Sequence, residues 1–228
     1  MKKTFVFFTE LLILCAMTFP DAIGQDTISF PLKIRIGADL YGPAYYYADK
    51  NTFTIEGFFS IDRDTLKSWS FDAGYSRFEF EQYNYHYNCK GVFLCSGIEF
   101  NVISPESSRG KYFAGAGLKY GMSYYTHEIP FLKSENYWGN VNISVKPSSQ
   151  LAHFIEASPG IRTEIFSNLS IGWTIRLRIL IYSGTDRDMK SVYIPGYGNG
   201  TKSFSPGINY YLVWSIPYKY LKLRKRNH

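Results

Sequence analysis

The stretch from Leu169 to Tyr182 alternates between apolar side chains and polar or small ones. Apolar residues occupy the odd positions, whereas serine, glycine, threonine and arginine occupy the even positions from Ser170 to Arg178. Because successive side chains of a β-strand point to opposite sides, the pattern predicts a strand with one apolar and one charged face. The two faces therefore need different surroundings.

The same alternation recurs along the chain, so we expect about eight strands. They are predicted at residues 33–40, 52–61, 68–78, 92–102, 112–124, 151–166, 169–182 and 205–217. Pro159 interrupts the sixth strand, where we expect a bulge or a lost ladder bond. Long connections at 41–51, 79–91, 126–150 and 183–202 alternate with short ones at 62–67, 103–111 and 167–168. Long loops at one end and short turns at the other are typical of outer-membrane barrels, with both chain ends on the short-turn side.

The N-terminus predicts an export signal. Lys2 and Lys3 precede an apolar stretch at residues 5–19, and Ala22 and Gly24 supply the small residues of a cleavage site. No later stretch has about 18 consecutive apolar residues, so any membrane crossing must be made by strands. The predicted divisions are a signal peptide at 1–24, an outer-membrane β-barrel at 25–218 and a basic C-terminal tail at 219–228.

The polar positions of the predicted strands carry basic and acidic side chains in equal number. They are Lys33, Arg35, Lys119, Arg162, Arg176 and Arg178, against Asp39, Glu56, Asp72, Glu99, Glu156 and Glu164. An arginine at mid-depth of a lipid-facing wall costs about 2–4 kcal/mol, so a membrane barrel must turn these charges inward. Eight strands enclose a space that side chains just fill. We expect an interior network of ion pairs and no open pore, whereas a porin would raise the ion conductance of a planar bilayer.

Tyrosine and tryptophan recur on the apolar face near predicted strand ends, in a chain that is 18% aromatic. Such positions suit the aromatic girdles that contact membrane interfaces. The predicted girdle is Trp69, Tyr75, Tyr112, Tyr124, Trp173, Tyr210 and Trp214. The main alternative is a soluble periplasmic β-barrel that turns its apolar face inward and binds an apolar ligand. The balanced charges and the small residues on the polar face favour the membrane barrel.

Candidates for catalysis and metal binding are few. The adjacent His127 and Glu128, with Ser123 nearby, are the strongest indication of a small lipid-modifying enzyme, which needs a base beside a nucleophile. Nothing else marks a catalytic triad, so we expect no enzyme and no catalytic residue. Cys89 and Cys95 lack the spacing of metal ligands, and on one strand they lie about 20 Å apart. That exceeds the disulfide reach of about 7 Å. We expect free thiols, no metal site and no cofactor.

Lipid of the outer membrane is the expected partner. The tyrosine clusters at residues 45–47 and 83–87 and the basic tail are candidate contacts for envelope proteins. Tyrosine also packs loops onto a barrel rim and anchors the rim at lipid headgroups, so both interpretations stay open. The formal net charge of +6 is spread along the chain, and we expect no nucleic-acid partner for an exported protein.

Several stretches resemble an uncharacterised family of Bacteroidetes outer-membrane β-barrel proteins, a domain of unknown function. They are residues 37–40, 156–164, 168–178, 193–197 and 207–218. The resemblance implies an all-β, antiparallel up-and-down transmembrane β-barrel of about eight strands, of OmpA or OmpX size, in the bacterial outer membrane. It implies no activity, so we expect a structural or interaction role. Many outer-membrane barrels end on the aromatic residue of the last strand, whereas here ten residues follow Tyr218.

Overall fold

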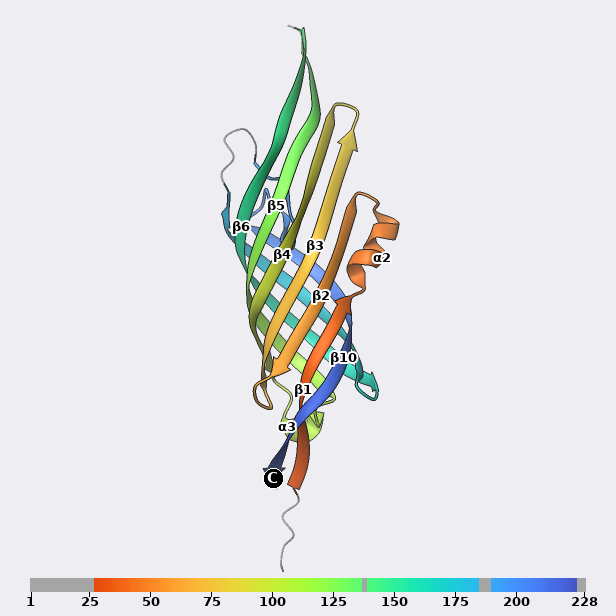
Figure 1. The fold of residues 1–228 in the computed structure, drawn as a ribbon, viewed down its shortest axis with the longest axis vertical. Coiled ribbons are helices and arrows are strands. Elements are labelled where there is room, and N and C mark those ends of the chain that lie inside the picture. The colour runs from red at the N-terminus through yellow and green to blue at the C-terminus, as the bar shows by residue number, and fades with distance from the viewer. Residues whose placement is uncertain (1–26, 137–138, 185–189, 225–228) are drawn as a thin grey trace, which may run out of the picture.

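The computed structural model describes residues 27–136, 139–184 and 190–224, and the predicted signal peptide lies outside them. Eight strands form one closed antiparallel barrel in the order β1-β10-β7-β6-β5-β4-β3-β2 (Figure 1). They are β1 (Thr27–Asp39), β2 (Thr52–Asp62), β3 (Lys67–Gln82), β4 (Tyr85–Asn101), β5 (Tyr112–Asn136), β6 (Gly139–Phe166), β7 (Leu169–Ser183) and β10 (Phe204–Arg224). The predicted up-and-down barrel is confirmed.

Four short elements lie in the connections. They are the helices α2 (Tyr41–Ala48) and α3 (Pro105–Ser108) and the paired strands β8 (Tyr193–Ile194) and β9 (Gly198–Asn199). None of the helices in the described ranges has the length and hydropathy needed to cross a membrane. We call the end where β1 begins and β10 ends the lower end, at the bottom of Figure 1.

Side chains alternate between the inside and the outside of the barrel along each strand. In β2, Glu56, Phe58 and Asp62 are buried, whereas Ile55 and Phe59 are exposed. Polar residues thus fill much of the interior and apolar residues cover the outer wall. A soluble barrel that carries an apolar ligand needs the opposite arrangement.

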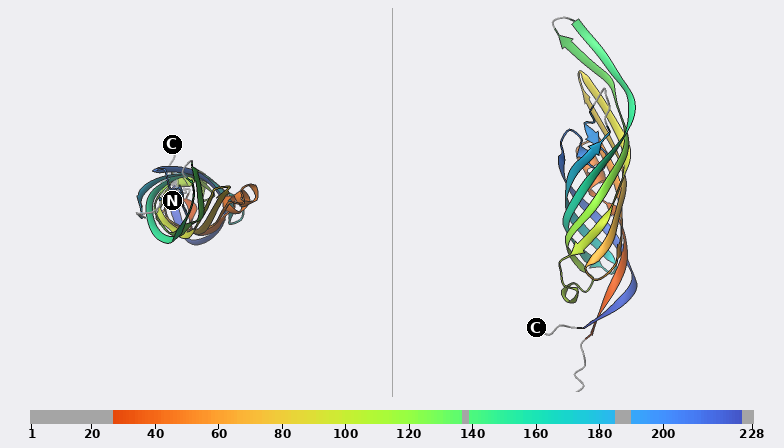
Figure 2. Two further views of the ribbon diagram at one scale, coloured as in Figure 1. Left: turned by 90° about the horizontal axis from the view of Figure 1, so that it is seen from above. Right: turned by 90° about the vertical axis from the view of Figure 1, so that its left-hand side faces the viewer.

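Two hairpins rise above the barrel body at the upper end (Figure 2, right). β3 and β4 are joined by a turn at Tyr83 and Asn84, and β5 pairs with β6 up to Asn136 and Gly139. The predicted long loops at 79–91 and 126–150 are therefore wrong, because most of these residues belong to strands. Alternation continues there, and cross-strand aromatic pairs such as Phe80 with Tyr85, at 6.1 Å between ring centroids, stabilise the longer pairing.

At the lower end, β1 and β10 continue below the barrel as a two-stranded ribbon. Thr27 pairs with Arg224, whereas β2 pairs only with the part of β1 from Ile34 to Ala38. Residues 219–224 of the predicted basic tail are therefore strand, and residues 225–228 lie outside the described part of the chain.

Pro159 interrupts hydrogen bonding without shifting the strand. The pairing of β6 with β7 passes from Ala157 to Gly160 in unchanged register. Register shifts occur instead between His153 and Phe154 and near the turn that follows Glu164. The proline thus removes a ladder bond, the second of the two predicted outcomes, because it has no backbone N–H to donate.

Candidate functional site: the filled barrel interior

The charged side chains of the interior form two groups. The lower group consists of Lys33, Arg35, Asp62, Glu99, Arg162 and Glu164. The upper group consists of Asp39, Glu56, Asp72, Lys119, Glu156, Arg176 and Arg178. The structure places all twelve charged residues singled out from the sequence inside the barrel, together with Asp62, which the sequence analysis had assigned to a turn.

Asp62 is the last residue of β2 and binds two neighbours on β1. Its carboxylate accepts hydrogen bonds from both terminal nitrogens of Arg35, one at 2.9 Å, and from the backbone N–H of Lys33 at 2.8 Å. The Lys33 ammonium in turn lies 2.5 Å from a carboxylate oxygen of Glu164. The alternation of side chains along β2 could have predicted that Asp62 faces the interior, because it lies six residues after Glu56 and therefore on the same face of the strand.

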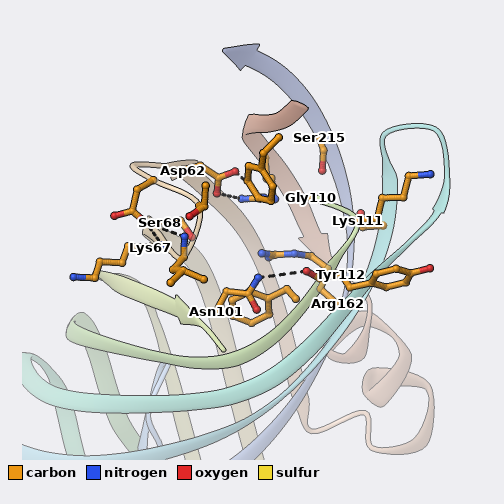
Figure 3. A pocket seen from close by; sticks show the side chains of 16 residues that line it. Asp62, Lys67, Ser68, Asn101, Gly110, Lys111, Tyr112, Arg162 and Ser215 are labelled. Atoms are coloured by element: carbon orange, nitrogen blue, oxygen red, sulfur yellow. Dashed lines mark hydrogen bonds and ion pairs between the residues drawn. The ribbon is translucent and has the colours of Figure 1, made fainter. Parts of the chain in front are cut away.

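A small cavity lies at the lower mouth, beside this group (Figure 3). Asp62, Ser68, Asn101 and Arg162 line it, and the Arg162 guanidinium lies 3.6 Å from a carboxylate oxygen of Glu99. Its volume of about 30 Å³ is room for roughly two water molecules. The lower mouth can therefore hold water but no organic ligand.

Arg176 is the centre of the upper group. Its Nη1 donates to Glu56 Oε2 at 2.8 Å, and its Nη2 donates to the other oxygen of the same carboxylate. Nη2 also lies 3.9 Å from Asp72 Oδ2, and Nε lies 3.8 Å from Glu156 Oε1. One guanidinium thus joins carboxylates from β2, β3 and β6.

Two further cations complete the upper group. The Lys119 ammonium lies 2.6 Å from Asp72 Oδ2, and Arg178 Nε donates to Glu156 Oε2 at 2.8 Å. Three cations therefore meet four carboxylates when Asp39 is included. A charge buried without a partner is costly, so these pairs fix the relative positions of the strands that carry them.

An apolar cluster lies between the two groups without separating them, because Glu99 of the lower group and Lys119 of the upper group line one small internal cavity. Phe58, Tyr211 and Val213 are buried together, and the rings of Phe58 and Tyr211 stack at 5.5 Å. Lys119 of the upper group and Arg162 of the lower group each lie 5.7 Å from the centroid of the Phe58 ring. Along β2, Phe58 also lies between the two groups in sequence.

The hairpin of β8 and β9 fills the upper part of the interior. The Tyr87 hydroxyl accepts the backbone N–H of Tyr193 at 3.4 Å, and the Cys89 thiol donates to the Tyr193 carbonyl at 3.3 Å. Arg178 donates to the carbonyl of Tyr197 at 3.3 Å. Burial raises the pKa of the Tyr193 hydroxyl, which therefore stays neutral at physiological pH. We call residues 191–199 the plug hairpin.

The turn of the plug hairpin requires glycine. Gly196 has a φ of +74°, and a Cβ at this position would lie 2.3 Å from the Phe93 ring. Around it, the plug hairpin packs into an apolar cluster inside the barrel. The buried members of the cluster are Tyr87, Cys89, Phe93, Cys95, Tyr125, Ile129, Ala152, Phe154, Ile194 and Tyr197. The interior is thus filled by charge pairs below and by aromatic packing above.

The outer wall carries the seven predicted girdle residues at three heights. Trp69 and Tyr112 lie near the lower ends of their strands, and Trp214 pairs with Leu169 at the lower end of β7. Tyr75 and Tyr124 both pair with Val92 near the upper ends. Trp173 and Tyr210 pair with each other between these rows. Five of the seven therefore lie at the two edges of the apolar wall and two lie within it.

Charged residues begin where the apolar wall ends. Arg77 and Lys90 pair with each other two residues above Tyr75 and Val92, and Arg77 lies 2.6 Å from Glu79 on the same outer face. At the lower edge, Lys67 is exposed and begins β3. The outer wall is thus an apolar band between two charged borders.

The candidate catalytic residues are not brought together. Ser123 and His127 both face the interior from β5, but they are four residues apart, a distance of about 13 Å along the strand. Glu128 follows His127 directly, so its side chain points to the opposite face of the strand.

Cys89 and Cys95 are both buried and free, which confirms the prediction of free thiols. In the described part of the chain, no group of three or more histidine, cysteine, aspartate or glutamate residues has a metal-binding arrangement.

Comparison with known proteins gives a family but no activity. The family model described as "Domain of unknown function (DUF6048)" matches residues 1–221. No curated protein matches the chain.

Similar solved structures are barrels from three bacterial sources. Neisserial surface protein A (NspA) shares 8% identity, with a TM-score of 0.41 over 83% of this chain and 99% of that one. CarO of Acinetobacter baumannii shares 10% identity, with a TM-score of 0.37 over 83% and 98%. The N-terminal β-barrel domain of Pseudomonas aeruginosa OprF shares 8% identity, with a TM-score of 0.31 over 84% and 100%.

Proposed function

We propose that this chain, which belongs to the DUF6048 family of unknown function, is an integral outer-membrane β-barrel with a filled interior. The observation that carries the proposal is the sidedness of the wall, with exposed apolar side chains outside and buried ion pairs inside. A closed barrel is also the β-structure that can cross a bilayer, because it leaves no backbone N–H or C=O unpaired at an edge.

The apolar band is too extensive for a surface in contact with water. Ile36, Ile55, Leu118, Ile161 and Ile179 are each more than half exposed and come from five different strands. The largest apolar patch on a typical soluble monomer is about 300–600 Å², whereas this band follows the barrel around. Acyl chains of lipid are the surroundings that suit it.

The proposed role is structural or interactive. The ion-pair groups, the cluster around Phe58 and the plug hairpin together fill the interior, which argues against an open pore. Contacts with envelope proteins are proposed through the exposed upper hairpins and the lower ribbon. The signal peptide predicted at residues 1–24 is the proposed route of export. The proposal does not include catalysis, because Ser123, His127 and Glu128 do not share a site.

Cell fractionation combined with gel electrophoresis tests the location. We expect the protein in the outer-membrane fraction, with a folded band that migrates differently from the heated sample. A species that stays in the soluble periplasmic fraction would refute the proposal. Reconstitution into planar bilayers tests the filled interior: we expect no added ion conductance, and sustained conductance would favour a porin.

A further inference from the structure

A second cavity opens at the upper mouth, beside the plug hairpin. It has a volume of about 440 Å³, within the roughly 300–1,000 Å³ typical of small-molecule sites. Its lining includes Glu56 and Arg178 of the upper group, Tyr41 and Tyr45 of α2, and Lys202. It is thus large enough for an organic ligand, unlike the lower cavity.

The position of α2 fixes one wall of this cavity. The Asp39 carboxylate accepts the backbone N–H groups of Tyr41 at 3.0 Å and Gly42 at 2.7 Å, which ties the start of the helix to β1. A Cβ at Gly42 would lie 2.4 Å from the carbonyl oxygen of Thr54, so helix and strand are in close contact. The wall is therefore preformed and needs no ligand to shape it.

The charges around the cavity are already compensated. Glu56 is paired with Arg176, and Arg178 is paired with Glu156. The remaining carboxylate, Asp39, is held by the backbone N–H groups of Tyr41 and Gly42, and Lys202 is an exposed residue of the cavity lining. An ionic ligand would have to compete with these pairs, so the site suits a neutral molecule.

The cavity offers hydroxyl groups and aromatic faces to such a molecule. The Tyr193 hydroxyl lies 3.4 Å from Ser76 Oγ, which lies 2.6 Å from Thr54 Oγ1, and each hydroxyl can donate and accept. Tyr41 and Tyr45 are 38% and 40% exposed, and their rings stack at 5.6 Å; the Tyr41 ring also lies 6.5 Å from that of Tyr210, so this aromatic side of the cavity reaches the outer rim of the barrel. Hydroxyls and flat apolar faces in one cavity match a sugar ring, which has polar edges and C–H faces.

We infer that this cavity binds a neutral saccharide of one or two sugar rings. The ligand has two sources, a free oligosaccharide or the sugar headgroup of a glycolipid in the outer leaflet. That choice of sources rests on the proposed membrane location, whereas the binding site itself does not.

The test uses the full chain in phospholipid nanodiscs, after its heat-dependent gel shift shows that it is folded. The probes are D-glucose, D-galactose, N-acetyl-D-glucosamine, lactose and maltose, with glycine and inorganic phosphate as ionic probes, measured by calorimetric titration. We expect at least one saccharide to bind with a dissociation constant of about 1 mM or below. Thr54→Val should weaken that binding about tenfold, the equivalent of one lost hydrogen bond.

Thr126→Val is the matched control. Thr126 also pairs its hydroxyl with a serine, Ser149 at 3.0 Å, but on the upper hairpin and away from the cavity. Binding to this variant should change by less than about twofold. Equal binding to both variants, tighter binding of glycine or phosphate, or no saccharide binding by the folded barrel would each overturn the inference.

Nanodiscs that contain lipopolysaccharide separate the two sources. If lipopolysaccharide competes with the soluble sugar, the headgroup occupies the site, and if the affinity is unchanged, the ligand is a free saccharide. Both results support the cavity as a saccharide site. Failure of the membrane proposal would appear in the fractionation experiment, independently of these titrations.

Discussion

Replacing Arg176 by methionine tests whether the upper charge group holds the barrel together. Methionine keeps much of the side-chain volume but removes the guanidinium that binds Glu56 through two hydrogen bonds, one of them 2.8 Å long. Breaking a buried ion pair from one side costs about 3–5 kcal/mol, because the remaining charge has no partner.

The structure narrows that range. Asp72 keeps Lys119 at 2.6 Å, and Glu156 keeps Arg178 at 2.8 Å, so Glu56 is the carboxylate that loses its main partner. We therefore expect Arg176→Met to lower the free energy of unfolding by about 3–4 kcal/mol. The double variant Arg176→Met/Glu56→Gln removes both members of the main pair, and its loss should be about 1–2 kcal/mol, typical of imperfectly bonded polar groups.

Guanidinium unfolding in lipid vesicles, followed by tryptophan fluorescence and gel mobility, measures both values. The comparison requires that the denaturant dependence is unchanged between variants, since a changed slope indicates a changed denatured or folded state. The reasoning is refuted if Arg176→Met costs less than about 1 kcal/mol, or if the double variant is as unstable as the single one.

Three other substitutions or reactions test separate parts of the structure. Leu118 is 59% exposed on the outer wall, and Leu118→Arg should lower the free energy of unfolding in bilayers by about 2–4 kcal/mol. The control Thr126→Arg on the upper hairpin should lower it by about 0–1 kcal/mol. Equal losses of both variants in vesicle unfolding would contradict a lipid-facing wall. Gly196→Ala should destabilise the fold by about 1–3 kcal/mol, because φ is +74° and the ring beneath leaves no room; an unchanged unfolding midpoint would contradict this. Cys89 and Cys95 should react with a maleimide only after unfolding, and mass spectrometry that finds rapid labelling of the folded barrel would show that the plug hairpin does not cover them.

The barrel could be predicted from the sequence because one physical rule acts along every strand. In the stretch from Leu169 to Ser183, a shift of one residue in strand register would turn the apolar side chains inward and the charged ones outward. The sequence of each strand therefore strongly specifies which face lies inside. The same rule placed Arg176 and Arg178 on the inside. Alternation alone could not predict which carboxylate forms an ion pair with each arginine. Glu56 is 120 residues away from Arg176 in sequence, and their pairing depends on closure of the barrel.

The upper end was harder to predict. The tyrosines and asparagines at residues 83–88 are typical of loops, yet only Tyr83 and Asn84 form a turn. The others belong to β4, because their aromatic side chains pack against each other. The plug hairpin carried a visible signal in Pro195 and Gly196, which indicates a turn. Nothing local indicates that this turn folds back into the barrel, since its binding surface is assembled from β3, β4, β5 and β6.

The Phe58 ring has a consequence for transport through the protein. With Tyr211 and Val213 it narrows the interior between the two mouths, but it does not insulate one charge group from the other. Glu99 of the lower group and Lys119 of the upper group line one internal cavity of about 10 Å³ together with Phe58. A change of charge in one group therefore acts on the other directly at this point, whereas the space beside the ring admits at most about one water molecule.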